Sequence, residues 1–203
     1  MPNSWINPEY LKDSIINKIR AGFLKSKPYP NFNLNNFFNE TKLLKLKKEI
    51  SKEKFERRNK DLFSFSNTKE LRYSENKAIG EFFSFLSSEG FLELIEKLTN
   101  EKNLKNIDMH AHDFVQGDYL LFHDDVVEDR KIAYIVYLSD FKKSDGGKLR
   151  FYDINHPIKP VKSIIPKFNS FACFKVSERS LHDVEEVKSN KSRLTVGGWL
   201  YGN

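Results

Sequence analysis

Three residues of the sequence are of the right types to share one metal ion. His123 and Asp125 lie two positions apart, and His182 follows far downstream. Two imidazoles and one carboxylate are the ligands that hold non-haem Fe(II) in oxygenases, with coordination positions left open. In an extended strand, residues i and i+2 point the same way, so His123 and Asp125 are able to face one ion. We therefore predict His123, Asp125 and His182 as metal ligands.

A positively charged residue further along the chain, Arg193, is a candidate binding residue for an anionic cosubstrate. Arg193 lies 11 residues beyond His182, in a strand-like run where Thr195 shares its face. The planar guanidinium can donate two parallel bonds to a carboxylate. A lone His-x-Asp pair arises by chance, and an arginine that starts a strand is often a surface ion pair. The combination favours a dioxygenase that uses Fe(II) and 2-oxoglutarate, with Arg193 and Thr195 binding the cosubstrate.

Length and composition limit the protein to a few classes. A chain of 203 residues with 39% hydrophobic residues suits one well-cored domain, here residues 1–203. The sequence has no apolar run of the roughly 20 residues needed to cross a membrane, and residues 1–6 do not resemble a signal peptide. Cys173 is the only cysteine, which fits a reducing compartment. We expect a cytoplasmic protein, or also a nuclear one if the source is eukaryotic, with no membrane partner.

The positive charge is concentrated in one segment. The net charge is +6, and residues 42–60 hold nine Lys or Arg against three Glu. Such a run is usually a solvated helix face, but a contact with nucleic acid or the ribosome is an open alternative.

The apolar patterns divide the chain into two halves. Residues 1–105 read as mainly helical and residues 106–203 as mainly β, which predicts an α+β fold with helices packed on one side of a β-sandwich or jelly roll. The expected helices cover residues 8–24 and 34–57, with two more around 82–86 and 91–98. The expected strands cover residues 132–138, 148–152, 161–165, 170–176 and 193–201.

Five blocks of the sequence resemble the Fe(II)/2-oxoglutarate-dependent prolyl hydroxylases, at residues 119–125, 132–138, 146–149, 176–182 and 191–199. The similarity is closest to the subgroup that 3-hydroxylates a prolyl residue of a ribosomal protein, and it covers most of the chain from about Pro28. It implies a double-stranded β-helix with buttressing N-terminal helices. It also implies Fe(II), 2-oxoglutarate and O2 as cofactors, with ascorbate as a supporting reductant. By this resemblance Arg193 holds the C5 carboxylate of 2-oxoglutarate and Tyr137 contributes to its pocket, while no further catalytic residue is expected.

Two departures from the family pattern bear on the function. Phe114 stands where a second pocket tyrosine is expected, so one hydroxyl contact is missing or is supplied by Tyr119 or His112. The chain also matches the catalytic domain alone, without the second, non-catalytic barrel of the eukaryotic ribosomal subgroup.

The substrate side of the pocket is expected to include Trp199 together with Asp124, Glu128 and Asp129. Acidic residues at an entrance favour a basic partner, so we expect a proline in a basic peptide or protein, such as a ribosomal protein. Two alternatives stay open. One is a hydroxylase of free proline or another small metabolite, and the other is a non-catalytic β-barrel that binds a ligand or partner.

Overall fold

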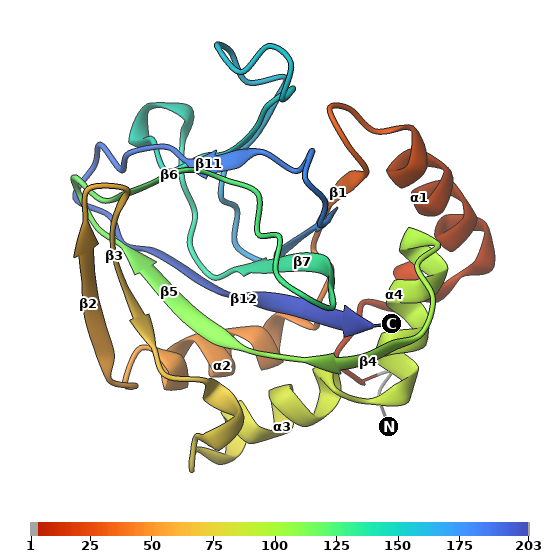
Figure 1. Ribbon diagram of the computed structural model, residues 1–203. Helices are drawn as coiled ribbons and strands as arrows, with labels where there is room; N and C mark the ends of the chain where they lie inside the picture. Colours follow the sequence, from red (N-terminus) through yellow and green to blue (C-terminus); the bar gives the residue numbers. More distant parts are fainter. Residues whose placement is uncertain (1–3, 203) are drawn as a thin grey trace.

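The core of the molecule is an antiparallel sheet that curls into a nearly closed barrel, the double-stranded β-helix (Figure 1). A computed structural model describes residues 4–202. The strands are hydrogen-bonded in the order β1-β10-β7-β12-β5-β3-β6-β11-β8-β9, with β2 paired to β3 and β4 paired to β12. The strands are β1 (Asn31–Asn35), β2 (Phe55–Lys60), β3 (Phe63–Thr68), β4 (Leu104–Ile107), β5 (His110–Phe114), β6 (Tyr119–His123), β7 (Arg130–Tyr137), β8 (Leu149–Phe151), β9 (Lys162–Ile164), β10 (Ser170–Lys175), β11 (His182–Val184) and β12 (Arg193–Gly202).

The helices pack against one side of this sheet and leave the β6–β11 end of the barrel uncovered (Figure 1). In α2, α3 and α4 a polar N-cap side chain accepts from free backbone N–H groups, and the apolar faces of the helices join the sheet in one large core. The ring of Phe37 stacks on that of Phe171 of β10, with centroids 4.6 Å apart. This arrangement confirms the predicted α+β class. The helices are α1 (Asp13–Lys25), α2 (Glu40–Ile50), α3 (Lys77–Leu86) and α4 (Glu89–Thr99), with short 3-10 turns at Pro8–Leu11, Leu71–Tyr73 and Lys143–Asp145.

The predicted helix over residues 34–57 is wrong at both ends. Helix α2 begins only after Asn39, whose side chain accepts a hydrogen bond from the Lys42 N–H, and it ends at Ile50. The chain then enters β2, which pairs along its whole length with β3. The carboxylate of Asp118 binds Arg57 of β2 through both guanidinium nitrogens. These long-range contacts outweigh the helical tendency of the Lys-rich sequence.

The basic segment 42–60 therefore does not form a single helix face. Its residues divide between α2, the following turn and the outer strand β2. Three of the nine cations form ion pairs, namely Lys52 with Glu49, Arg57 with Asp118 and Arg58 with Glu56. Among the residues that the structure describes, none of the helices has the length and apolar character that a membrane span requires.

A close backbone approach in the middle of β12 gives a testable prediction for stability. A Cβ atom at Gly198 would lie 2.3 Å from Asp108 Oδ1 and 2.6 Å from the Asp108 carbonyl oxygen. The same carboxylate accepts hydrogen bonds from the Trp199 N–H and the Tyr201 hydroxyl. We expect Gly198→Ala to lower the free energy of unfolding by about 1–3 kcal/mol, because an added methyl has no space there.

Urea denaturation measures this effect. Gly80 of α3 is the matched control, because no neighbouring atom would lie within 4 Å of an added Cβ and alanine favours a helix. Gly80→Ala should leave stability equal or raise it by about 0.5–1 kcal/mol. Equal stability of Gly198→Ala and the wild type would show that the close contact between Gly198 and Asp108 does not require glycine at this position.

Candidate functional site

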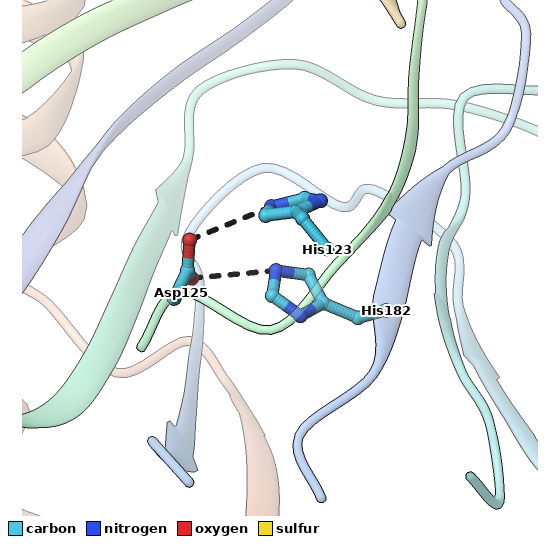
Figure 2. A group of neighbouring side chains, drawn as sticks. All are labelled: His123, Asp125 and His182. Carbon is cyan, nitrogen blue, oxygen red and sulfur yellow. Dashed lines mark ion pairs between the residues drawn. The ribbon is translucent and has the colours of Figure 1, made fainter. Parts of the chain in front are cut away.

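The three predicted metal ligands lie together at the open end of the barrel (Figure 2). His123 ends β6, and His182 begins β11 directly opposite it in the paired strand. The His123 Nε2 atom lies 3.5 Å from Asp125 Oδ1, and the His182 Nε2 atom lies 3.3 Å from Asp125 Oδ2. One potential ligand atom from each residue falls within 4.8 Å of the others. The group thus has the composition and compactness of a site for one metal ion.

The strand geometry predicted for the first two ligands is not what brings them together. Strand β6 stops at His123, and Asp125 lies beyond it in a left-handed backbone conformation with φ of 65°. Aspartate tolerates this conformation better than most residues. Beyond the turn, the carboxylate faces both imidazoles, with one oxygen atom directed toward each ring (Figure 2).

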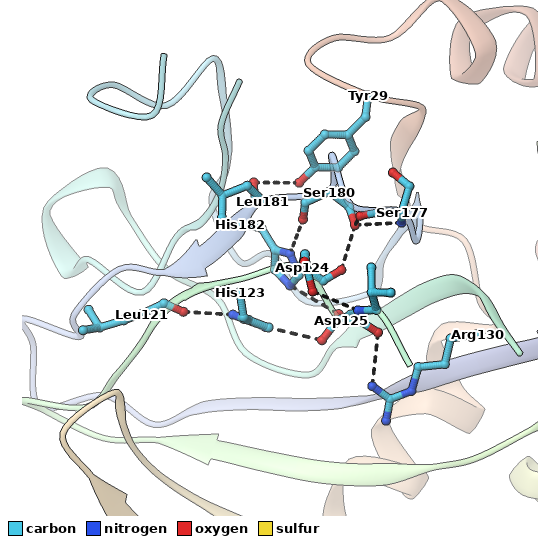
Figure 3. Close-up of polar contacts among 11 residues, drawn as sticks. Tyr29, Leu121, His123, Asp124, Asp125, Arg130, Ser177, Ser180, Leu181 and His182 are labelled. Carbon is cyan, nitrogen blue, oxygen red and sulfur yellow. Dashed lines mark hydrogen bonds and ion pairs between the residues drawn. The ribbon is translucent and has the colours of Figure 1, made fainter. Parts of the chain in front are cut away.

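Backbone carbonyl groups orient both imidazoles (Figure 3). The Nδ1 atom of His123 lies 2.9 Å from the Leu121 carbonyl oxygen, and that of His182 lies 2.7 Å from the Ser180 carbonyl oxygen. A carbonyl only accepts hydrogen bonds, so in each ring Nδ1 is the protonated donor. In the neutral form of each ring the lone pair is then on Nε2, the atom that faces Asp125, and this is the tautomer that metal coordination requires.

A second set of contacts holds the loop that carries Asp125 (Figure 3). The Ser180 hydroxyl donates to the Asp124 carbonyl oxygen at 2.7 Å, and Arg130 Nη1 donates to the Asp125 carbonyl oxygen at 3.3 Å. The Arg130 guanidinium also lies 3.4 Å from the centre of the Trp199 ring, which is a cation–π contact. The loop that carries Asp125 is therefore held by the segment before β11 and by Arg130 at the start of β7, which in turn packs on Trp199 of β12.

The electrostatics of the group suit a divalent cation. Burial opposes ionisation of Asp125, but its hydrogen bond to His182 and the charges of both imidazoles outweigh burial and hold its carboxyl pKa at about 2. Burial and the neighbouring His182 lower the pKa of His123. At neutral pH the group therefore presents an ionised carboxylate and a neutral His123 imidazole, which are the coordinating forms.

A cavity of about 310 Å³ opens beside the three residues. This volume is at the lower end of the range for small-molecule sites. Its walls are mainly aromatic and aliphatic, with a few polar side chains among them. The lining includes Phe63, Phe65, His112, Phe114, Leu120, His123, Asp125, Leu149, Phe174, His182, Val184, Arg193, Thr195 and Trp199.

Arg193 brings a buried positive charge to this cavity. Its side chain donates from Nε to the Gly147 carbonyl oxygen at 2.7 Å, and the residue is 2% exposed. The guanidinium lies between the rings of Phe114 and Tyr137, at 5.2 and 5.4 Å. No carboxylate in residues 4–202 forms an ion pair with it. Burial lowers its pKa, and an unpaired buried cation calls for an anion.

Two further predicted cosubstrate residues lie beside Arg193. Thr195 lines the cavity, and Tyr137 packs directly across from it in β7. The Tyr137 hydroxyl is buried and has no hydrogen-bond partner among residues 4–202. Burial raises the Tyr137 pKa, and the neighbouring Arg193 guanidinium opposes this rise. Tyr137 does not itself line the cavity.

The predicted substrate residues separate into two groups. Trp199 lines the cavity, whereas Asp124, Glu128 and Asp129 do not. Asp124 Oδ1 accepts a hydrogen bond from the Val126 N–H within the loop, while Glu128 and Asp129 are exposed on it. These acidic side chains are therefore near the ligand-bearing segment in sequence but outside the pocket wall.

The two candidates for the hydroxyl missing at Phe114 also differ in position. The Tyr119 hydroxyl donates to the Asp61 carbonyl oxygen at 3.3 Å, and Tyr119 does not line the cavity. His112 does line it. Sequence reasoning missed the Gly147 carbonyl that anchors Arg193, because the Gly146–Gly147 pair indicates only a turn.

Residues 109–201 match the family model described as the 2OG-Fe(II) oxygenase superfamily. The chain contains a 2OG-Fe(II) oxygenase domain. This match covers every residue of the His-Asp-His group as well as Arg193. The resemblance inferred from the sequence is thereby confirmed at the level of the domain.

Curated relatives extend the similarity beyond this region. Prolyl 3-hydroxylase OGFOD1 of Xenopus laevis is 35% identical over 185 residues, which cover 88% of this chain and 36% of the relative. The chain thus spans about a third of that relative's length.

Two solved structures share the fold. The prolyl-4-hydroxylase of Pseudomonas putida has a TM-score of 0.75 at 15% identity and covers 93% of this chain and 99% of its own. The Trichoplax adhaerens prolyl hydroxylase was solved in complex with a hypoxia inducible factor peptide fragment. It has a TM-score of 0.73 at 16% identity, and the match covers 97% of this chain and 93% of the Trichoplax chain. At these identities the likeness concerns the fold.

The cofactors of this family are Fe(II), 2-oxoglutarate and O2, and the side chains of the chain fit them. The nitrogen and oxygen donors of the His-Asp-His group suit Fe(II). The guanidinium of Arg193, which lines the cavity and has no ionised partner within residues 4–202, suits the carboxylate of an oxo acid.

Proposed function

We propose that this chain is a 2-oxoglutarate-dependent dioxygenase that hydroxylates a prolyl residue in a protein. The observation that supports it best is the presence of two complementary binding elements along one cavity. One is the His-Asp-His group, and the other is the buried, unpaired Arg193. The prolyl hydroxylase names of the relatives favour proline as the residue that is modified.

In this proposal each side chain has a defined role. His123, Asp125 and His182 would hold Fe(II), and Arg193 would bind the C5 carboxylate of 2-oxoglutarate with Thr195 and Tyr137 beside it. When bound, Fe(II) and 2-oxoglutarate supply the oxidation, in which O2 and the oxo acid yield succinate, CO2 and a hydroxyl group on the substrate. The chain itself orients these groups, and its aromatic cavity walls exclude water from them.

Exposed apolar side chains near the metal group support a polypeptide substrate. Leu121 and Phe122 precede His123 on β6, and Val126 and Val127 follow Asp125, all with substantial exposure. Ile158, in the loop between β8 and β9, is 90% exposed. The β8–β9 loop rises above β6 and β11, whereas the segment after β6 runs toward the start of β7 (Figure 1). A group of exposed apolar residues commonly marks a protein-binding surface, and a free amino acid would not need one.

Mass spectrometry tests the proposal. Candidate proteins and proline peptides are incubated with the protein, Fe(II), 2-oxoglutarate and ascorbate. A substrate should gain about 16 Da, the mass of one oxygen atom, and fragmentation then locates the hydroxylated proline. The Asp125→Asn variant is the negative control. Hydroxylation of free proline alone would favour the small-metabolite alternative, and absence of any succinate formation would favour a non-catalytic barrel.

The charge of the substrate is a further prediction. Glu128 and Asp129 are exposed beside the ligand-bearing loop, so a basic proline peptide should be turned over about tenfold faster than a matched acidic peptide at low salt. The preference should shrink as salt screens the charges. The double variant Glu128→Gln with Asp129→Asn should lose most of it. Equal turnover of both peptides by the wild type at low salt would contradict this prediction.

The domain bounds, the substrate protein, the supporting reductant and the cellular location are also proposals, and they start from the sequence resemblance. We propose one oxygenase domain over residues 1–203, because β1 pairs with β10 and β3 pairs with β5 and β6 across the two halves. A basic ribosomal protein is the proposed substrate, with ascorbate as a supporting reductant. A cytoplasmic location, or a nuclear one in a eukaryote, fits the buried free thiol of Cys173.

A further inference from the structure

His112 occupies the inner face of the sheet next to the cosubstrate residues. It lies on β5 directly across from Thr195 of β12, and Thr195 lies directly across from Tyr137 of β7. Residues that are directly opposite in an antiparallel sheet project to the same face. His112, Thr195 and Tyr137 thus form one row, and the neighbouring row holds Phe114 and Arg193.

The imidazole of His112 borders the cavity and is not used by the protein. The ring lines the cavity together with Arg193 and Thr195. Within the described part of the chain, residues 4–202, its nitrogen atoms take part in no hydrogen bond. The nearest rings are those of Phe65 and His110, with centroids 5.8 and 6.3 Å away. The side chain is only partly buried, so the imidazole is open to a ligand from the cavity that it lines.

His112 also lies within electrostatic range of both binding elements. Burial, followed by the charges of His110 and Arg193, lowers its pKa to about 3, while the Asp125 carboxylate acts in the opposite direction. The ring is therefore neutral at physiological pH, with one N–H donor and one acceptor nitrogen. A ligand that reaches from the metal group to Arg193 would pass within reach of this ring.

We infer that His112 donates a hydrogen bond to the 2-oxo acid held between the metal group and Arg193, and is a further cosubstrate-binding residue of this chain. The inference rests on the proposed function, since it requires that 2-oxoglutarate binds in this cavity. His112 is not a metal ligand, because the metal-binding group found among the described residues consists of His123, Asp125 and His182.

The test is isothermal titration calorimetry of the Mn(II)-loaded protein with 2-oxoglutarate, without O2, so that binding is measured without turnover. His112→Phe keeps an aromatic ring but removes the N–H donor, and should weaken 2-oxoglutarate binding about 10- to 100-fold. His112→Gln keeps a donor and should recover part of the affinity. Mn(II) affinity should be unchanged in both variants, because the ligands are intact.

His110 is the matched control, because it lies two residues away on the same face of β5 but does not line the cavity. His110→Phe should bind 2-oxoglutarate with an affinity within about twofold of the wild type. A change of that size is much smaller than the loss of affinity expected when one charge-assisted hydrogen bond is removed. Wild-type affinity in His112→Phe, or an equal loss in His110→Phe, would overturn the role of His112 while leaving the proposed function intact. Failure of the wild type itself to bind 2-oxoglutarate would instead overturn the proposed function, and the role of His112 with it.

Discussion

Replacing Asp125 with asparagine is expected to weaken binding of Fe(II) at least 100-fold and to abolish turnover. In the proposed site the carboxylate is one of the three protein ligands and carries the negative charge of the group, and its two oxygen atoms lie 3.5 and 3.3 Å from the Nε2 atoms of His123 and His182. Changes to residues that only orient metal ligands commonly cost 10- to 100-fold in affinity, so loss of a ligand should exceed that range. Metal content after dialysis and anaerobic titration with Fe(II) measure the effect.

Asp129 offers a closely matched control for this experiment. Asp125 and Asp129 have nearly the same left-handed backbone, with φ of 65° and 66°, and asparagine tolerates that conformation equally well. Both changes remove one carboxylate from the same loop. Only Asp125 faces the imidazoles, so Asp129→Asn should retain wild-type iron binding. Iron affinity that falls equally in both variants would point to general charge or loop effects and would remove Asp125 from the metal site.

The composition of the metal group is predictable from sequence, whereas its geometry is not. Imidazole and carboxylate ligands are recognisable by residue type, and this is what distinguishes His123 and His182 in the sequence. Their proximity depends on the pairing of β6 with β11, which connects segments about 60 residues apart in the sequence. The position of Asp125 depends on a left-handed turn, which the strand pattern before it does not signal.

The same distinction applies to the fold. Strands β7, β10 and β12 are predictable because buried strands are rich in β-branched and aromatic residues. Strand β2 is not, because its sequence is charged and continues a Lys-rich helix without a proline or glycine between them. Its conformation is decided by pairing with β3 and by the Arg57–Asp118 ion pair, which a local pattern does not contain.

Arg193→Ala should weaken binding of 2-oxoglutarate about 30-fold or more while leaving the metal group intact. Truncating one partner of a buried, hydrogen-bonded charge pair costs about 2–5 kcal/mol, and each 1.4 kcal/mol is about a tenfold change in affinity. Arg193→Lys should recover only part of the affinity, because lysine keeps the charge but lacks the planar fork. Calorimetry of the Mn(II)-loaded variants measures the three affinities. Unchanged affinity in Arg193→Ala would show that another group holds the carboxylate.

Stability measurements on the same residue separate its binding role from a structural one. Without 2-oxoglutarate the buried guanidinium has no ionised partner within residues 4–202, and its neutral partners are the Gly147 carbonyl oxygen, 2.7 Å from Nε, and Tyr137. Arg193→Met keeps an unbranched apolar stem between the rings of Phe114 and Tyr137 and removes the desolvated charge. The unliganded variant should therefore be as stable as the wild type or more stable, because replacing buried charge with apolar groups is often neutral or stabilising. Addition of 2-oxoglutarate should then raise the melting temperature of the wild type but not that of Arg193→Met, since a ligand stabilises only the protein that binds it. A large loss of stability in unliganded Arg193→Met would assign this arginine to the fold, whereas a loss confined to the liganded state would assign it to the cosubstrate.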